Sequence, residues 1–166
     1  MLIQVISGGQ TGADLGGLIA ARASGLRTGG WMPKGFLTLD GARPDLARKF
    51  GLQEHSSARY PPRTRRNVQQ SDATLRFARH WHTSGERATL KFIHQYRKPY
   101  LDVSVDSPPS PTEVADWLRE HRVRILNVAG NTERNAPGIE KIVADYLAVV
   151  FGCASLGARE KPNRIH

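Results

Sequence analysis

A glycine-rich stretch directly after a short apolar run constrains this chain most. The run LIQVI is followed by SGGQTGADLGG, residues 7–17, which holds five of the sixteen glycines in eleven positions. Glycine permits positive φ angles and close backbone approach, and the N–H groups that open a helix attract anions. The stretch therefore predicts a strand, a tight turn and a helix at an anion site. It is neither a Walker A loop nor a GxGxxG fingerprint, so a tight turn without a ligand is the alternative.

The same order of strand and helix recurs along the chain. Helical patterns are expected at about 13–23, 88–96, 112–121 and 139–151, and each follows an apolar run such as ATLRFA, PYLDVSV or RILNVAG. Strand-then-helix repetition indicates parallel strands joined by crossover helices. We therefore expect an α/β fold, a Rossmann-like domain whose mainly parallel sheet has helices on both faces.

The domain organisation follows from length and composition. A chain of 166 residues with 39% apolar content suits one packed domain, which we expect over residues 1–157. The charged segment at 158–166 is expected to be a flexible C-terminal tail. Residues 27–71 are expected to be irregular apart from a short helix in ARPDLARKFG.

The charge balance favours anionic partners. The 24 Lys and Arg exceed the 15 Asp and Glu and give a net charge of +9. The single cysteine excludes an internal disulfide, and the six histidines have no metal-binding spacing, so no structural metal is expected. No apolar run reaches the roughly 18 residues of a membrane span, and the start lacks a signal-peptide pattern. We expect a cytoplasmic protein without a membrane partner.

Ligands of open parallel sheets bind beyond the carboxyl ends of the strands, so the loops there supply the candidate residues. In the first loop these are Gly8, Gly9, Gln10 and Gly12. Asp14 falls in the first helical turn, where the helix dipole stabilises a carboxylate without any function. It could equally accept hydrogen bonds from a ribose hydroxyl, a base amino group or a pterin ring.

Two further loops repeat this arrangement. Ser84 and Gly85 precede a helix and add a hydroxyl to the anion-binding pattern, although Ser is also a common helix cap. Gly130 and Asn131 end a later strand, and Glu133 follows them. Glu133 could activate a water molecule, or it could form an ion pair in a solvated turn.

The basic stretch RYPPRTRRNVQQSDAT is taken as a fourth loop. Its arginines, between Arg59 and Arg66, suit phosphate recognition or a nucleic-acid surface, and a solvated basic loop is the simpler alternative. Aromatic residues make up 7% of the chain and are not interleaved with these arginines, which argues against nucleic acid.

Several of these stretches together resemble the putative molybdenum carrier family. The resemblance lies in SGGQTGADLGGLIAA, GGWMPKGF, FGLQEHSSARYPPRTRRNVQQSDAT, KPYLDV and NVAGNTERNAPGI, and it runs from about residue 3 to 150. That family is described as a circularly permuted YpsA-type branch of the Rossmann-like group that includes the Lonely Guy and lysine-decarboxylase-like proteins. The Lonely Guy signature PGGxGTxxE is absent, so that activity is not transferred.

The resemblance implies a site for the phosphorylated pterin of molybdenum cofactor or for a nucleotide derivative. By matching positions it adds Thr11, Arg63, Thr64, Asn67 and Asp72 to the expected ligand-binding residues. It also implies a homo-oligomer. The chain departs from the family at residues 84–87, where Glu and Arg replace small residues and put a phosphate contact in doubt.

Three functions follow. The first is a binding protein, a molybdenum cofactor (molybdopterin) carrier or a nucleotide-ligand sensor, that holds a phosphorylated small anion. The second is a hydrolase of a phosphorylated nucleoside with Glu133 or Asp14 as the catalytic carboxylate. The third is nucleic-acid binding through Arg59–Arg66.

Overall fold

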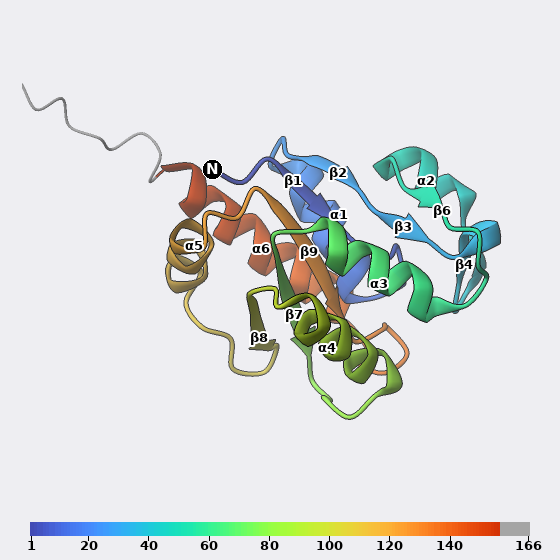
Figure 1. Ribbon diagram of the computed structural model, residues 1–166. Coiled ribbons are helices and arrows are strands. Elements are labelled where there is room, and N and C mark those ends of the chain that lie inside the picture. Colours follow the sequence, from blue (N-terminus) through green and yellow to red (C-terminus); the bar gives the residue numbers. More distant parts are fainter. Residues whose placement is uncertain (157–166) are drawn as a thin grey trace, which may run out of the picture.

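A five-stranded parallel sheet runs through the centre of the protein in a computed structural model that describes residues 1–156 (Figure 1). The strand order is β2-β1-β9-β7-β8. The bounds are Gln4–Ile6 for β1, Arg27–Gly29 for β2, Ala73–Ala78 for β7, Tyr100–Ser104 for β8 and Ile125–Gly130 for β9. In register, Val5 of β1 lies opposite Leu126 of β9, and Leu75 of β7 lies opposite Val128. The predicted Rossmann-like α/β fold is confirmed.

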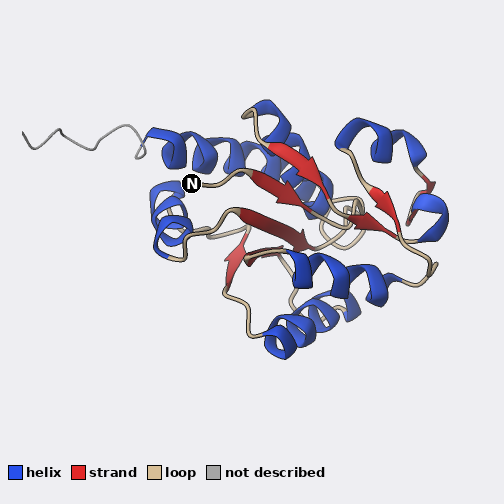
Figure 2. Ribbon diagram, turned by 45° about the horizontal axis from the view of Figure 1, so that its top comes forward, coloured by secondary structure: helices blue, strands red, loops and turns tan. Residues whose placement is uncertain are grey.

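Helices cover both faces of this sheet (Figure 2). Helices α1 (Ala13–Ala23), α5 (Pro111–Glu120) and α6 (Ile139–Leu156) pack together on one face. Helices α3 (Tyr60–Gln70) and α4 (Ser84–Tyr96) pack together on the other. The main core lies between the sheet and the first group, where Val128, Val143 and Leu147 are fully buried. The predicted tail at 158–166 lies outside the described residues.

Local sequence explains where the helices begin. At α5, the Ser110 hydroxyl accepts from the Glu113 N–H and the Glu113 carboxylate accepts from the Ser110 N–H, which forms a capping box. At α4, the Thr83 hydroxyl accepts from the Glu86 N–H at 3.3 Å, so this helix begins four residues before its predicted start. Gly51, at φ 68°, ends the short helix α2 (Pro44–Phe50) that the sequence also predicted.

The segment between β2 and α3, residues 30–59, forms a small subdomain beside α1. Strand β3 (Trp31–Met32) pairs with β6 (Gln53–Glu54), and β4 (Leu37–Thr38) forms a hairpin with β5 (Gly41–Ala42) after the 3-10 helix η1 (Lys34–Phe36). Leu18, Met32 and Phe50 join this segment to α1 in a second core.

The prediction of a loop at RYPPRTRRNVQQ is wrong, because these residues form helix α3. The two prolines, Pro61 and Pro62, occupy its first turn. They break no hydrogen bond there, because first-turn N–H groups have no acceptor within the helix.

Two glycines let the loops after the strands pack backbone to backbone. Gly12 has φ +89°, and a Cβ there would lie 2.7 Å from the backbone nitrogen of Glu133. Gly130 has φ +156°, and a Cβ there would lie 2.8 Å from the carbonyl carbon of Phe77. Real Cβ atoms almost never approach other atoms so closely. These contacts join the loop after β1 to the loop after β9, and the end of β9 to the end of β7, at one edge of the sheet.

Candidate functional site

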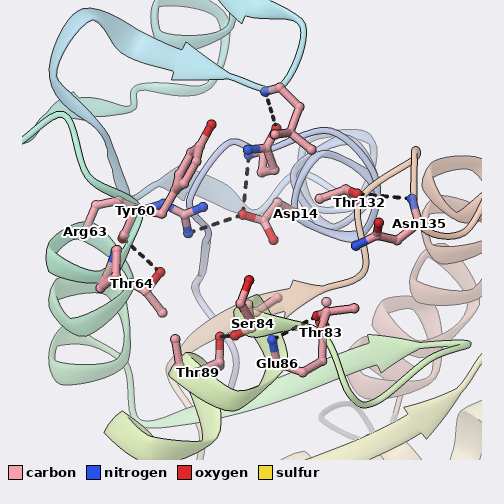
Figure 3. A pocket seen from close by; sticks show the side chains of 17 residues that line it. Asp14, Tyr60, Arg63, Thr64, Thr83, Ser84, Glu86, Thr89, Thr132 and Asn135 are labelled. Carbon is pink, nitrogen blue, oxygen red and sulfur yellow. Dashed lines mark hydrogen bonds and ion pairs between the residues drawn. The ribbon is translucent and has the colours of Figure 1, made fainter.

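A cavity of about 300 Å³ lies at this edge, beyond the carboxyl ends of β1, β9 and β7 (Figure 3). Strand β9 lies between β1 and β7. From β1 the chain continues to β2, toward one edge of the sheet, and from β7 it continues to β8, toward the other edge. Ligands of open α/β sheets bind at the point where this direction reverses. The walls come from the loop after β1, the first turns of α3 and α4 and the loop after β9. The lining includes Gln10, Asp14, Leu39, Tyr60, Pro61, Arg63, Thr64, Ser84, Gly85, Glu86, Ala129, Gly130 and Thr132.

Arg63 and Asp14 form a buried pair in this cavity, and Figure 3 shows them pointing toward each other. Arg63 Nη1 lies 3.8 Å from Asp14 Oδ2, and the two side chains are only 11% and 6% exposed. Burial raises the pKa of Asp14, and the charge of Arg63 opposes that rise. Arg63 Nε is buried without a hydrogen-bond partner among residues 1–156. The guanidinium therefore has an unused donor beside the cavity.

Gly8 has a packing role that the sequence did not reveal. A Cβ at this position would overlap the guanidinium of Arg63 and would come within 2.8 Å of Asp14 Oδ2. Gly8 therefore makes room for an internal cation rather than for a ligand.

The N–H groups of the glycine loop already have partners. Those of Gly8 and Gln10 donate to Asp14 Oδ2 at 3.0 and 3.4 Å, and those of Gly9 and Thr11 donate to neighbouring side-chain oxygens at 3.1 and 3.0 Å. Asp14 thus takes the place that an anion would occupy in this turn. The expectation that this loop offers its donors to a phosphate is corrected, because the protein supplies its own carboxylate.

The first turn of α4 offers the free donors instead. Ser84 and Gly85 are exposed and line the cavity, as the sequence predicted for this loop. The N–H groups of a first turn have no acceptor within the helix, and the Thr83 cap satisfies only that of Glu86. Helix α3 offers fewer donors here, because Pro61 and Pro62 lack an N–H.

Glu86 is a lining residue that the sequence analysis treated only as a bulky obstacle. Its side chain is buried, and burial raises its pKa, with a further contribution from the charge of Asp14. Arg76 fixes the backbone here, because its Nη1 donates to the Glu86 carbonyl at 3.1 Å while its other nitrogens bind Asp102 at 2.7 and 2.5 Å. A Glu three residues after a Thr cap is typical of a capping box, so the pattern gave no signal for the cavity.

Two predicted site residues from the basic stretch lie elsewhere. Asn67 accepts from the Trp31 N–H at 2.9 Å and donates to the Trp31 carbonyl at 3.1 Å, which ties α3 to β3. Asp72 precedes β7 and accepts from the N–H groups of Arg124 and Ile125 at 2.9 and 2.8 Å. Asp72 therefore lies at the opposite end of the sheet, and its expected place in the site is corrected.

Two residues after β9 support the site without lining it. Glu133 accepts from the N–H groups of Gly138 at 2.5 Å and Glu140 at 3.1 Å, and so organises the start of α6. Asn131 Oδ1 accepts from the His80 N–H at 3.0 Å and its amide donates to the His80 carbonyl at 2.9 Å. The expectation of Glu133 as a catalytic carboxylate in the site is corrected, because backbone donors hold both of its oxygens.

The residues that the structure describes hold neither a cluster of metal ligands nor a helix suited to span a membrane. Within residues 1–156, no group of three or more His, Cys, Asp or Glu is placed to hold a metal ion. None of the helices in this range combines the length and the apolar character that crossing a bilayer requires.

Comparisons with known proteins agree with this architecture. A crystal structure of a putative molybdenum carrier protein from Syntrophus aciditrophicus SB superimposes with a TM-score of 0.81 at 35% sequence identity, covering 90% of this chain and 94% of the other. No curated protein matches the chain. The model of the circularly permuted YpsA SLOG family matches residues 5–151. The family model thus matches nearly the whole described chain, and the carrier structure has a similar fold. The protein therefore belongs to the circularly permuted YpsA SLOG family.

Proposed function

We propose that the cavity binds a phosphorylated pterin or nucleotide-like anion, and that the protein carries molybdenum cofactor as its cargo. One observation carries the proposal. The free N–H groups and hydroxyl at the start of α4 share the cavity with Arg63, whose Nε is buried and unpartnered. Such a helix start beside a buried cation favours a phosphate.

The two carboxyl groups suit the ring end of such a ligand. A carboxylate accepts hydrogen bonds from a pterin or purine amino group and ring N–H, and a protonated carboxyl also donates. Burial raises the pKa of both Asp14 and Glu86 above its ordinary value. Leu39, Pro61 and Ala129 add apolar contacts for a planar ring in a cavity of about 300 Å³.

The binding role is favoured over the hydrolase. Backbone N–H groups hold both oxygens of Glu133, and Asp14 Oδ2 accepts from two backbone N–H groups. A general base needs a free oxygen within reach of the attacking water, and both oxygens of Glu133, which does not line the cavity, are held by backbone N–H groups. The molybdenum part of the proposal is supported by the similarity, at 35% identity, to the putative molybdenum carrier protein of Syntrophus aciditrophicus.

The test is calorimetric titration with pterin phosphates, nucleoside monophosphates and molybdate, with the protein and its Ser84→Pro variant. Proline is favoured at the first helical position, and the extended Thr83 (ψ 159°) accepts a following proline, so α4 should remain folded. The variant loses one N–H and one hydroxyl. A lost hydrogen bond to a charged group costs about 1.5–3 kcal/mol, so phosphate affinity should fall roughly 10- to 150-fold.

Two variants serve as controls. Ser84→Ala removes the hydroxyl but keeps the N–H, and it should lose less affinity than Ser84→Pro. Arg59→Gln removes a positive charge outside the cavity and should bind as the unmodified protein does. The proposal fails if no phosphorylated compound binds or if Ser84→Pro binds with unchanged affinity. Metal analysis of protein taken directly from its cells then tests whether molybdenum accompanies a bound pterin.

A further inference from the structure

The outward face of α3 carries a second cavity, of about 490 Å³, which the proposed function does not use. Residues 62, 65, 66 and 69 of α3 line only this second cavity and residues 60, 63 and 64 line only the first, whereas Pro61, in the first turn, lines both. A period of 3.6 residues per turn separates these two sets onto different faces of the helix. Phe92 of α4 contributes an aromatic ring to the second cavity.

The charge of this outward face is not neutralised. Residues 55–71 include four arginines and no Asp or Glu. Three of the arginines, Arg59, Arg65 and Arg66, are exposed and line the cavity. In the described part of the chain, no carboxylate lies within ion-pair distance of these three, although the exposed Arg119 does pair with Asp116.

Aromatic rings hold two of these guanidinium groups in place. The guanidinium carbon of Arg66 lies 4.9 Å from the centre of the Trp31 ring. That of Arg65 lies 5.9 Å from the Tyr96 ring, and Arg65 Nε donates to the Tyr96 hydroxyl at 2.6 Å. The rings come from β3 and α4, so each of these arginines lies beside an aromatic ring that is distant from it in sequence. The sequence argument against nucleic acid therefore does not hold for this surface.

We propose that this basic groove, formed by Arg59, Arg65, Arg66 and Phe92, binds single-stranded nucleic acid. The guanidinium groups bind successive phosphates, and an unstacked base lies against the half-buried Phe92 ring. A duplex keeps its bases stacked inside, so it cannot offer one to Phe92. The chemistry is common to DNA and RNA, and only a contact to the 2′-hydroxyl would separate them.

The experiment measures fluorescence anisotropy of labelled single strands of about 12 nucleotides, as DNA and as RNA, with the full chain. Three phosphate contacts predict a slope of about −2 in log affinity against log salt, so affinity should fall roughly 20-fold between about 50 and 200 mM salt. The double variant Arg65→Gln/Arg66→Gln should lower that slope to about −0.7. Phe92→Leu removes base stacking and should weaken binding roughly 5- to 150-fold.

A matched control removes the same charge elsewhere. Arg48→Gln/Lys49→Gln changes two exposed basic residues of α2 and should leave affinity and salt slope unchanged, apart from a small general effect. Equal losses in the two double variants would overturn the proposal, as would the absence of binding at low salt. Equal or tighter binding of a duplex or a glutamate-rich peptide would overturn it too. Because Ser84 lines the first cavity and not the groove, Ser84→Pro should leave nucleic-acid binding unaltered, which keeps this test separate from that of the proposed function.

Discussion

Replacing Gly12 by Ala tests whether the glycine loop exists for internal packing. Gly12 has φ +89°, and a methyl group there would lie 2.7 Å from both the Glu133 nitrogen and the Thr132 carbonyl carbon. A non-glycine residue in a left-handed conformation costs about 1–2 kcal/mol, and an overpacked methyl costs a further 1–3 kcal/mol. Backbone atoms cannot move aside as a flexible side chain can. We therefore expect Gly12→Ala to lower the free energy of unfolding by about 3–4 kcal/mol.

Gly25→Ala is the matched control. Gly25 also has a positive φ, +74°, but nothing lies within 4 Å of a Cβ built there. Only the conformational strain remains, so this variant should lose about 1 kcal/mol. Urea denaturation followed by tryptophan fluorescence gives both values, and their difference, about 2–3 kcal/mol, isolates the close approach between the loops. Equal losses in the two variants would refute the packing argument.

Three further predictions concern a buried carboxyl group, a buried arginine and a helix cap. Burial raises the folded-state pKa of Glu86 above its ordinary value of 4.5, so the stability it contributes is present below that value and is lost as pH rises through the folded pKa. The free energy of unfolding should therefore fall by up to about 1.4 kcal/mol per pH unit above pH 4.5. Glu86→Gln should remove this fall, which urea denaturation at a series of pH values measures. Arg76→Lys should cost about 2 kcal/mol, because lysine cannot reproduce the fork that binds Asp102, and thermal unfolding would show it. Ser110→Ala should cost about 1 kcal/mol through the lost cap with Glu113, and a loss below about 0.3 kcal/mol in urea would contradict that role.

The sequence predicted the elements whose signals are local. Apolar runs followed by capped amphipathic stretches identified β1, β7, β8 and β9 and the helices after them, because hydrophobic periodicity and caps act within a few residues. The two-residue strands β3 to β6 carry too few positions for a periodic signal. Helix α3 was missed because Pro61 and Pro62 are typical of loops, although the first helical turn also accepts them.

The sequence predicted where the candidate site lies better than it predicted which residues form it. Ser84, Gly85 and Arg63 reach the cavity, since strand ends of a parallel sheet converge at one edge. Which groups are already paired depends on contacts between distant segments. Asp14 accepts hydrogen bonds from the loop N–H groups, and Glu133 accepts them from N–H groups at the start of α6. The spacing of residues in the sequence does not reveal these tertiary contacts.

The central place of β9 has a consequence for the order in which the protein matures during synthesis. Strands β1 and β7 do not pair with each other, and each pairs with β9, whose first residue is Ile125. Until that strand has left the ribosome, the sheet consists of two separate pairs, β1–β2 and β7–β8, each with an open inner edge. The walls of the cavity come from these two halves and from the loop after β9, which ends beyond Asn135, so a nascent chain completes the cavity only after that loop has been made. Ligand present during translation would then stabilise the finished domain alone and would not rescue a chain that stops before residue 125.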